Sequence, residues 1–463
     1  MDTPWWLLAL ICHCVLLAPW VLVFQGADVE PYMDEVFHIP QAQRYCEGRF
    51  EEWDEKITTF PGLYVFSAAL SRVSRPFGGQ LCSPARLRAD NALLSLGVQV
   101  LLYRLLRRRL PPAKAAAQAL ALSLYPIHFF CAFIYYTDVG SLFWALLVHD
   151  LATPSRGRAL PTSGRIVLAA VAGLVAILFR QTNAVWMMFS FGTAALGDLQ
   201  STHKWGPQLR GEELTPSLLF TFAKALLLES RRLVFRLGPL LIPVLLFVAF
   251  VVHNGSIVVG DKSNHEASVH WAQLAYLSAV TAAMWGLVGP DAAVSAGSLR
   301  AFCKARFGSL RAVLLTAVAL CLLVFVLHRY SVAHPFLLAD NRHYTFYVWG
   351  RFLGRRPGLK EALAPAYLYT AWLCSSRLSR AQSSLWTLIW WVAAALTLVP
   401  AGLLEPRYWT TAVLMAHAHA EERSWRSICV SGLLSLAINT ATLAVFVYRP
   451  FIWPGGELAR FMW

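Results

Sequence analysis

Two neighbouring carboxylates, Asp34 and Glu35, are the first residues in this sequence whose types and spacing could do chemistry. If the stretch from 32 to 41 is helical, Asp34, His38 and Gln41 share one face at i, i+4 and i+7, and Glu35 lies beside it. A carboxylate held in this way could act as a general base that takes a proton from a hydroxyl group. A solvated acidic cap on a short loop helix explains the same residues about equally well.

A second type of cluster offers cationic and amide donors near the ends of apolar stretches. The runs are Arg180 to Asn183, Asp261 to Glu266, and Asp340 to His343 with His334 shortly before it. Guanidinium, imidazole and amide groups suit an anionic ligand, and an arginine can hold two phosphate oxygens through parallel hydrogen bonds. A lone arginine could instead reach toward lipid headgroups, but a run of four polar residues is harder to explain in that way.

The remaining polar residues have simpler explanations. Asp138 ends a Tyr-Tyr-Thr-Asp run and could line a cavity, although capping of the following helix is favoured. His417 and His419 are two residues apart, which separates their rings on a helix and argues against a metal site. Among the nine cysteines, only Cys46 and Cys82 fall in segments that could face an oxidising lumen. They could form a disulfide, although unpaired thiols are favoured.

These residues belong to an unusually apolar chain. Of the 463 residues, 57% are hydrophobic and 14% are charged, whereas soluble domains carry about 25% charged residues. A membrane span needs about 20 mostly apolar residues, and many such runs follow one another here. The composition therefore predicts an all-α polytopic membrane protein in which residues 1–463 form a single multi-span domain.

The apolar runs predict about 11 to 14 transmembrane helices. The first run, Trp5 to Phe24, is long enough to span and has no small-residue cleavage site after it, so we interpret it as a retained signal anchor. Clear later spans are expected at about 90–106, 118–136, 139–153, 166–180, 184–199, 238–253, 271–288, 312–328, 385–403 and 430–448. Weaker candidates lie near 60–78, 336–350, 359–374 and 408–420.

The positive charge of the chain indicates membrane topology rather than nucleic-acid binding. The formal net charge is +14, but the basic residues form short clusters between apolar runs, as cytoplasmic loops do. Cytoplasmic loops are therefore expected at 104–114, 154–165, 200–236 and 300–311. This puts the acidic loop 25–60 and the polar runs on the opposite, lumenal side, and it requires the stretch 61–77 to return without crossing. In the last third of the chain the two sides fit about equally well.

Five segments, considered together, resemble a known family. They are Tyr-Met-Asp-Glu-Val-Phe-His-Ile-Pro-Gln-Ala-Gln-Arg-Tyr-Cys at 32–46, Thr-Thr-Phe-Pro-Gly-Leu-Tyr at 58–64, Phe-Arg-Gln-Thr-Asn at 179–183, Asn-Gly-Ser-Ile-Val-Val-Gly-Asp at 254–261 and His-Pro-Phe-Leu-Leu-Ala-Asp-Asn-Arg-His-Tyr at 334–344. Through these segments, and to its end at Trp463, the chain is similar to the dolichyl-phosphate-glucose-dependent α-1,2-glucosyltransferases of asparagine-linked glycosylation. The stretch 405–410, followed by His417 and His419, departs from the aromatic and aliphatic span usual in that family.

The resemblance implies a fold, a location and a reaction. The fold is a GT-C-type bundle of membrane-spanning helices, with its active site on the lumenal face of the endoplasmic reticulum membrane. The reaction moves the third and last glucose from dolichyl phosphate glucose to the 2-hydroxyl of the terminal glucose of a diglucosylated, dolichyl-diphosphate-linked oligosaccharide. A β-linked donor and an α-linked product imply inversion, so one base and one stabiliser of the leaving phosphate suffice.

Within that reaction each polar group receives an expected role. Asp34 is expected to be the base because it shares a helix face with other polar residues, and Glu35 is expected to orient the acceptor. Further acceptor contacts are expected from His38, Gln41, Tyr136 and Asp138. Contacts to the donor phosphate, which leaves as an anion and needs cationic donors, are expected from Arg180, Asn183, His334, Arg342 and His343. Arg342 could instead serve a structural role by pairing with Asp340.

Other classes of protein and ligand fit less well. A transporter or channel is also polytopic, but it places ionisable residues near the membrane midplane and often has internal repeats, neither of which is evident here. A non-catalytic regulatory subunit would not need acidic and basic clusters on one face. No glycine loop for a nucleotide and no carboxylate pair for a divalent ion is evident, so we expect no cofactor and no required metal.

Overall fold

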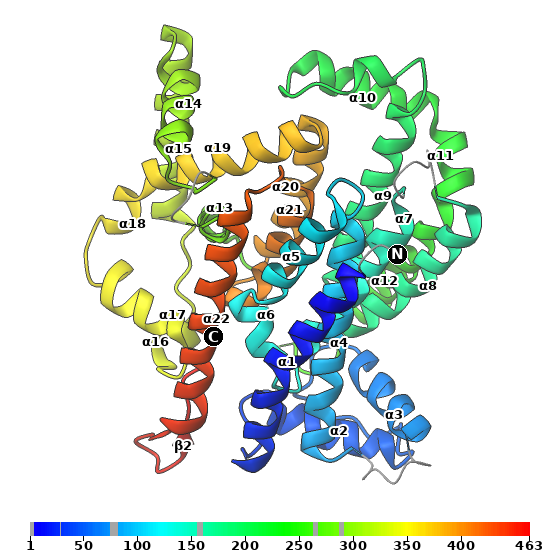
Figure 1. Cartoon of the computed structure of the whole chain (residues 1–463), viewed down its shortest axis with the longest axis vertical. Helices are drawn as coiled ribbons and strands as arrows, with labels where there is room; N and C mark the ends of the chain where they lie inside the picture. The colour runs from blue at the N-terminus through cyan, green and yellow to red at the C-terminus, as the bar shows by residue number, and fades with distance from the viewer. Residues whose placement is uncertain (1–3, 28, 75–81, 155–160, 263–266, 287–290) are drawn as a thin grey trace. The chain divides into compact units, whose positions relative to one another are not determined.

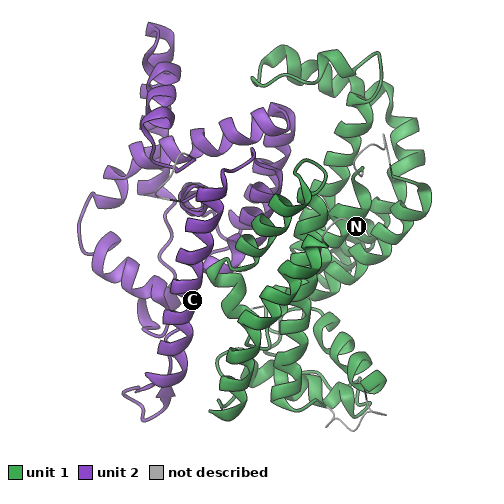
Figure 2. Ribbon diagram, viewed as in Figure 1, with its two compact units in different colours: residues 1–266 green, residues 267–463 purple. Residues whose placement is uncertain are grey.

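The computed structural model describes residues 4–27, 29–74, 82–154, 161–262, 267–286 and 291–463, and these residues are almost entirely helical (Figure 1). Residues 263–266 of the second polar run lie outside the described residues. The chain divides into two compact units, unit 1 with residues 1–266 and unit 2 with residues 267–463 (Figure 2). Compactness alone does not decide whether a unit folds independently, so the single multi-span domain stays a prediction.

Unit 1 is built around two central helices. α4 packs against α1, α5 and α7, and α7 packs in turn against α8 and α9. The start of α4 follows from its sequence, because Ser83 accepts a hydrogen bond from the Arg86 amide (3.4 Å) and Pro84 takes the first helical position, where an N–H is not needed. The helices of this unit are α1 (Trp5–Gly26), α2 (Glu35–Cys46), α3 (Gly62–Ser74), α4 (Pro84–Leu106), α5 (Pro112–Ser123), α6 (Pro126–Cys131), α7 (Thr137–Ala152), α8 (Ser163–Phe179), α9 (Asn183–Gln200), α10 (Pro216–Leu228), α11 (Ser230–Leu237) and α12 (Leu241–Asn254), with 3-10 turns at Gly206–Gln208 and Gly238–Leu240.

The continuous span expected at 118–136 is wrong. α5 ends at Ser123, α6 is a short helix that begins at Pro126, and residues 132–136 are not helical. Pro126 causes the first break, because its ring and missing N–H exclude it from a helix interior. The following non-helical backbone is buried, and the Asn91 side chain donates hydrogen bonds to the carbonyls of Ile134 (2.7 Å) and Tyr136 (2.9 Å). Protein groups therefore satisfy backbone that lipid could not.

Contacts between loops define one end of unit 1, which we call the acidic-loop end. The side-chain amide of Gln181 donates to the Thr58 carbonyl (2.8 Å), and the backbone amide of Asp261 donates to the Glu55 carbonyl (2.7 Å). Gly260 lies so close to this loop that an added Cβ would be 2.3 Å from the Glu55 carbonyl oxygen, and its φ of +70° also favours glycine. The loop after the first helix, the turn before α9 and the segment after α12 thus meet at one end.

Both described ends of α3 are held at the acidic-loop end. A Cβ at Gly62 would lie 2.5 Å from the Leu178 carbonyl carbon, so only glycine allows α3 to begin against α8. Near the other end of α3, Ser71 Oγ lies 3.2 Å from Cys82 Sγ, and Cys82 is disulfide-bonded to Cys46. The structure thus contains the disulfide, although unpaired thiols were favoured from the sequence. The position of both described ends of α3 at the acidic-loop end also agrees with the prediction that the stretch 61–77 does not cross the membrane. Residues 75–77 of that stretch lie outside the described residues.

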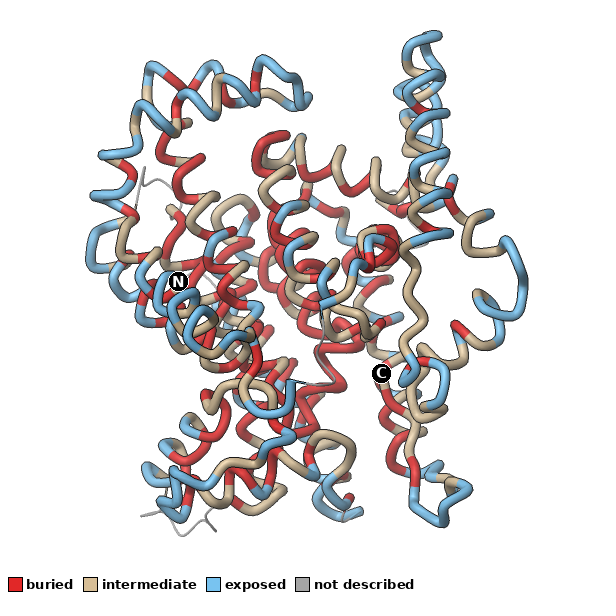
Figure 3. Tube along the Cα trace, turned by 180° about the vertical axis from the view of Figure 1, so that it is seen from behind, coloured by how far each residue is buried: buried red, intermediate tan, exposed pale blue. Residues whose placement is uncertain are grey.

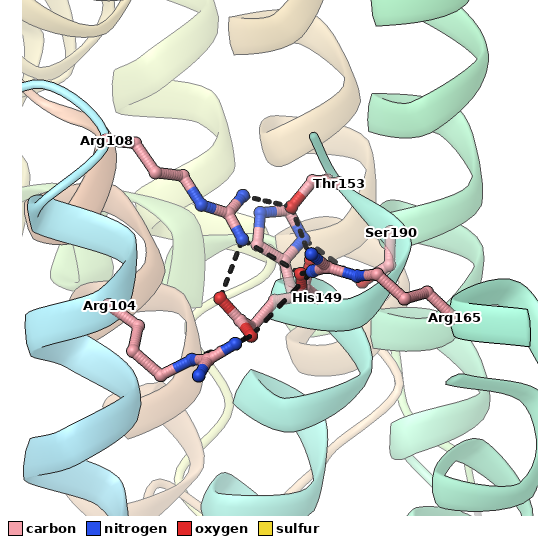
Figure 4. Close-up of polar contacts among 7 residues, drawn as sticks. Arg104, Arg108, His149, Thr153, Arg165 and Ser190 are labelled. Atoms are coloured by element: carbon pink, nitrogen blue, oxygen red, sulfur yellow. Dashed lines mark hydrogen bonds and ion pairs between the residues drawn. The ribbon is translucent and has the colours of Figure 1, made fainter. Parts of the chain in front are cut away.

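The opposite end of unit 1, which we call the arginine end, is held by buried carboxylates. Near the end of α7, Asp150 accepts hydrogen bonds from Arg104 of α4 (2.7 Å) and from Arg108 in the turn after α4 (2.7 Å), and Arg165 of α8 donates to the Asp150 backbone carbonyl (Figure 4). Asp198 of α9 pairs in the same way with arginines of α11. The described parts of the expected cytoplasmic loops 104–114, 154–165 and 200–236 are at this end. The third loop contains α10 and α11, which the sequence reading did not predict.

Unit 2 is built around α19, which packs against α13, α15 and α20. The expected span at 336–350 is wrong, because α16 and α17 are short helices separated by the polar residues 340–343. The elements of this unit are α13 (Ala272–Met284), α14 (Ala296–Phe307), α15 (Leu310–Arg329), α16 (Pro335–Ala339), α17 (Tyr344–Val348), a π turn at Trp349–Leu353, α18 (Leu359–Ala362), α19 (Ala364–Ala381), α20 (Ser384–Leu398), a 3-10 turn at Pro406–Trp409, α21 (Thr410–His419), α22 (Trp425–Tyr448), and the antiparallel strands β1 (Phe451–Ile452) and β2 (Leu458–Ala459).

Hydrogen bonds also define two ends of unit 2. At one end the Ser268 amide donates to the Pro400 carbonyl (2.9 Å), and the chain after α15 lies beside the start of α13. At the other end the Arg423 guanidinium donates to the Trp285 carbonyl (3.1 Å), and Arg380 pairs with Glu421 (2.6 Å). The α19–α20 and α21–α22 connections therefore share an end with the end of α13. This ordering groups the connections of the last third of the chain by end, and the side of the membrane that each end faces stays a prediction.

Exposure along the helices agrees with a membrane protein. Four helical segments are long and apolar enough to cross a membrane, namely Trp5–Gly26, Ser230–Asn254, Leu310–Arg329 and Trp425–Tyr448, and shorter apolar helices accompany them. In the third of these only 11% of the apolar window is buried inside the protein, which leaves its side chains for lipid. α14 has no buried residue at all (Figure 3). The exact number of spans stays a prediction.

Candidate active site

Glu35, the first residue of α2, is completely buried in a dense set of hydrogen bonds. Its Oε1 accepts from Arg88 Nε (2.9 Å) and from the Tyr135 amide (2.7 Å), and its Oε2 accepts from Arg88 Nη2 (2.7 Å) and the Tyr32 amide (3.2 Å). Arg88 also donates to the Val29 carbonyl (2.7 Å). A buried, bidentate pair of this kind fixes geometry. Glu35 therefore joins α2, α4 and the segment before α7.

Asp34 lies directly before this pair and is partly exposed. Its backbone amide donates to the hydroxyl of Tyr136 (3.0 Å), so its position is fixed from the segment that Glu35 also contacts. The turn that leads into α2 places Met33 at φ +53°, a left-handed conformation that side chains rarely adopt. A strained residue beside a fixed carboxylate is a common feature of functional sites. Of the two neighbouring acids, Asp34 is the one with solvent access.

His38 and Gln41, the other two residues of α2 that the sequence predicted for the site, have different surroundings. His38 Nδ1 lies 2.6 Å from the Tyr64 hydroxyl, and its ring meets the edge of Tyr136 at 6.1 Å between centroids. Gln41 is buried, donates to the Glu52 carbonyl (2.7 Å) and accepts from the Asp54 amide (2.9 Å). The contacts of His38 keep it beside Asp34, whereas those of Gln41 favour a role in holding the acidic loop.

An ion pair between Asp138 and Arg180 lies at the same end of unit 1. Asp138 is in the first turn of α7, and Arg180 follows the last residue of α8. The side chains are 9% and 18% exposed, so the pair is accessible at one edge. The sequence predicted an acceptor role for Asp138 and a donor-phosphate role for Arg180. The structure brings the two residues into direct contact.

Asn183 points into the helix bundle. Its side-chain amide donates to the Ser141 hydroxyl (2.9 Å) and to the Ala176 carbonyl (2.7 Å), and the residue is 1% exposed. These contacts join the start of α9 to α7 and α8. They favour a packing role for Asn183 over the phosphate contact expected from the sequence, because the donor atom is already occupied between helices.

The remaining predicted phosphate ligands belong to unit 2. Arg342 forms a two-bond pair with Asp340 (2.8 Å each) and stacks over Trp453 at 4.3 Å from the ring centroid. His343 Nδ1 lies 3.1 Å from the carbonyl oxygen of Trp463, and His334 caps the start of α16 through the Phe336 amide (3.2 Å). The polar run at 340–343 is thus held against the C-terminal segment.

Burial and hydrogen bonding have opposite effects on the pKa of Asp340. Partial burial raises the pKa of this carboxyl, but hydrogen bonds from the Arg342 side chain and amide outweigh burial and leave the pKa below its usual value. Asp340 is therefore ionised at neutral pH and holds the Arg342 guanidinium in place. The pairing with Asp340 is also what a purely structural role of Arg342 would produce.

Sequence reasoning missed Arg88 and Tyr64 as members of this site. Arg88 gave a signal, because it lay on the side opposite to the expected cytoplasmic loops. Tyr64 gave a signal only as the last residue of the segment 58–64 that resembles the family, and no role was expected for it. Within the described residues no group of three or more His, Cys, Asp or Glu side chains could hold a metal ion, so no ligand set is assigned.

The apolar helices define a multi-pass membrane protein with a polar site at one end of unit 1, and comparison with known proteins makes the class specific. Residues 28–418 match the DIE2/ALG10 family, so this chain belongs to that family. No solved structure matches the chain.

The similarity to individual family members extends over nearly the whole chain. A protein of Mus musculus is 35% identical over 98% of this chain and 98% of its own length. A protein of Arabidopsis thaliana is 34% identical over 96% and 97%, and one of Drosophila melanogaster is 33% identical over 98% and 98%. Each is named Dol-P-Glc:Glc(2)Man(9)GlcNAc(2)-PP-Dol alpha-1,2-glucosyltransferase.

Proposed function

We propose that this chain transfers glucose from dolichyl phosphate glucose to the 2-hydroxyl of the terminal glucose of the diglucosylated, dolichyl-diphosphate-linked oligosaccharide. The observation that carries the proposal is the full-length similarity to proteins named for this activity, joined to a partly exposed acid, Asp34, whose backbone amide is held by Tyr136. A transporter or a regulatory subunit is not favoured, because the relatives are named as enzymes.

Asp34 is proposed as the general base. Its backbone is held by Tyr136, and the neighbouring Glu35–Arg88 pair fixes the start of α2. In an inverting displacement, this carboxylate takes the proton of the acceptor hydroxyl as the oxygen attacks the anomeric carbon and the bond to phosphate breaks. A positioned base contributes about 10²–10⁴-fold in rate. Glu35 is proposed to position Asp34, rather than to touch the acceptor, since its oxygens are already bonded.

Acceptor contacts are proposed for His38, Tyr136 and Asp138. The Tyr136 hydroxyl accepts from the Asp34 amide, the His38 ring contacts Tyr136, and Asp138 follows two residues after Tyr136. Arg180 is proposed to bind the donor phosphate. In the structure it pairs with Asp138, which keeps the guanidinium charged and oriented at the edge of the site. On binding, the phosphate would share this arginine, and the bond would strengthen as charge grows on the leaving oxygen.

His334, Arg342 and His343 of unit 2 are proposed as further donor-phosphate contacts, each in the conformation fixed by the contacts described above.

We also propose that the acidic-loop end faces the lumen of the endoplasmic reticulum and the arginine end faces the cytosol. The positive-inside rule supports this orientation, because the clusters of Arg104, Arg108 and Arg165 lie at one end. No cofactor is proposed, since dolichyl phosphate glucose is a substrate.

The experiment uses purified full-length protein, dolichyl phosphate glucose and the diglucosylated acceptor, with the product measured after separation of the glycans. Wild-type protein should add one glucose in α-1,2 linkage, and Asp34→Asn should lose at least about 100-fold in turnover, as expected when a general base is removed. Glu51→Gln, which changes an exposed acid in the same loop, is the matched control and should keep normal turnover. Absence of transfer by the wild-type protein would contradict the proposed activity.

A further inference from the structure

Unit 2 contains a polar cavity of about 210 Å³ at the end where α13 finishes. This is the end opposite to Ser268 and Pro400, so the cavity is separate from the residues assigned to glucose transfer. α14, α19 and the segment before α22 form its walls. The polar lining residues are Asp291, Ser298, Arg377, Arg380, Glu421 and Arg423, together with Glu422 at the edge.

Two buried arginines in this lining have no acidic partner. Arg377 is 8% exposed and Arg423 is 2% exposed. Arg377 donates to the Asp291 backbone carbonyl (2.8 Å), and Arg423 donates to the Ser427 carbonyl (3.0 Å) and the Ser431 hydroxyl (2.9 Å). Among the described residues, neither guanidinium lies within 4.0 Å of a carboxylate, and the buried Nε of Arg423 has no hydrogen-bond partner.

The acidic residues of the lining are already engaged elsewhere. Glu421 accepts two hydrogen bonds from Arg380 (2.6 and 2.9 Å). The side chain of Asp291 accepts from the Ser424 amide (2.6 Å). Burial lowers the pKa of Arg423 to about 10, although the charge of Asp291 opposes this, so the group remains a cation at neutral pH. The three acids and three arginines of the lining balance in formal charge, but within the part of the chain that the structure describes the guanidinium groups of Arg377 and Arg423 have no carboxylate in direct contact.

Two buried guanidinium groups without a directly contacting carboxylate can accept an anion that enters the cavity. Burying an uncompensated charge is costly, and an unsatisfied buried donor adds to that cost. Guanidinium groups match phosphate oxygens better than other common anions because they offer donors in a planar fork. The volume exceeds the roughly 30 Å³ that one water occupies in the liquid and is sufficient for a phosphate with part of a headgroup. The cavity opens beside α14, whose exposed surface carries Arg300 and Lys304.

We propose that this cavity binds a phosphate group through Arg423 and Arg377. The same chemistry could come from a phospholipid headgroup or from free inorganic phosphate. Its position next to the expected cytoplasmic segment 300–311 makes it distinct from the lumenal donor phosphate of the proposed reaction. A bound phosphate would connect α19 with the start of α22 and so stabilise unit 2.

The test measures binding to the purified full-length protein in detergent by the shift in Tm, with inorganic phosphate in one arm and phosphatidic acid in mixed micelles in the other. Two variants remove the site by independent means. Arg423→Gln deletes the buried cation. Gly297→Leu fills the cavity, since Gly297 lines it and an added Cβ meets no atom within 4 Å. Each should weaken binding by about tenfold or more, the expected loss for a charged hydrogen bond or a blocked site.

Two matched controls accompany these variants. Arg426→Gln removes an exposed arginine three residues from Arg423, and Gly164→Leu adds the same side chain at the second residue of another helix, again into open space. Both should keep the wild-type shift. Stabilisation in the first arm identifies free phosphate, and stabilisation by phosphatidic acid alone identifies a headgroup. The proposal is overturned if neither probe binds the wild type, or if Gly297→Leu binds as the wild type does. Should Arg423→Gln not fold, Gly297→Leu decides.

Discussion

Asp34 and Glu35 are adjacent in the sequence and of the same chemical type, yet their surroundings differ. Glu35 is completely buried and bonded to Arg88 and the Tyr135 amide, whereas Asp34 is partly exposed and held through its backbone by Tyr136. Glu35 can position neighbouring residues, but both of its carboxylate oxygens already accept hydrogen bonds from the protein. The exposed acid can meet a hydroxyl group. This difference is the basis for assigning the two roles.

The Glu35–Arg88 pair should be important for stability as well as for turnover. Glu35→Gln leaves Arg88 buried without its counter-charge, which costs about 3–5 kcal/mol. We expect a clear fall in Tm and a lower kcat with little change in KM for the acceptor, because the base is misplaced rather than removed. Glu35→Gln with Arg88→Met should recover much of the Tm but not the kcat. A Glu35→Gln protein with normal Tm and no turnover would instead identify Glu35 as the base.

Arg342 and Asp340 offer a test of the donor-phosphate role. Arg342→Ala should reduce the rate at limiting dolichyl phosphate glucose by at least about tenfold, since charge-assisted hydrogen bonds are worth about 1.5–3 kcal/mol, and should change the acceptor KM little. Arg342→Lys should rescue only partly because the fork is lost. Exchange of the two residues, as Asp340→Arg with Arg342→Asp, keeps an ion pair but moves the cation. Normal activity of the exchanged enzyme would show that Arg342 is structural.

Whole helices, rather than single side chains, depend on the buried carboxylates at the arginine end. Asp150, on α7, connects to α4 through Arg104, to the turn after α4 through Arg108, and to α8 through Arg165. It is 2% exposed, so its charge is compensated almost entirely by these arginines. Asp150 thereby holds α7 and α8 in register. At their other ends these two helices present Tyr136 and Arg180.

Asp150→Asn should weaken this packing without touching the site. The amide cannot balance several arginines, so the expected loss of stability is about 2 kcal/mol, at the level of a broken, partly buried charged contact. Thermal unfolding in detergent should show a lower Tm, while turnover measured well below that Tm stays within about twofold of the wild type, less than a 1 kcal/mol effect. Glu212→Gln, an exposed acid at the same end, is the control. An unchanged Tm for Asp150→Asn would contradict the role of Asp150 in joining the helices.

Across the whole molecule, the order of ends in each unit gives a topology that can be tested with a native residue. Cys303 is an exposed, free cysteine of α14, within the segment expected to face the cytosol. A membrane-impermeant maleimide should label it in sealed microsomes whose cytosolic face is outward. A cysteine placed at Gly455, in the exposed turn between β1 and β2, should react only after the membrane is permeabilised.

Cys303→Ser supplies the control for the first signal, and it should abolish labelling from the outside. Labelling of a protein that carries both Cys303→Ser and Gly455→Cys in sealed vesicles would reverse the orientation proposed for unit 2. Because the two positions lie near opposite ends of unit 2, one orientation cannot expose both from the same side.

The sequence by itself determined the membrane class, most of the helical segments and the segments that contain the site. Apolar runs long enough to span specify helices because lipid cannot satisfy open backbone, and this gave α1, α7, α8, α9, α12, α15 and α22 within a few residues. The motif around Asp34 and its similarity to a known family indicated the reaction. These properties depend on local composition and spacing, which a sequence displays directly.

Only the tertiary structure decided how the polar residues are partnered. Glu35 and Arg88 are 53 residues apart, Arg180 and Asp138 are 42 apart, and Asn183 reaches Ser141 inside the bundle. No periodicity relates such positions, because their proximity depends on which helices pack together and at which register. The Cys46–Cys82 disulfide likewise needed the packed chain, whereas the break at Pro126 follows from a local property of proline that the span prediction overlooked. Chemical type can be read from the sequence, but the burial and partners that turn one acid into a positioning group and its neighbour into a candidate base arise only when the helices meet.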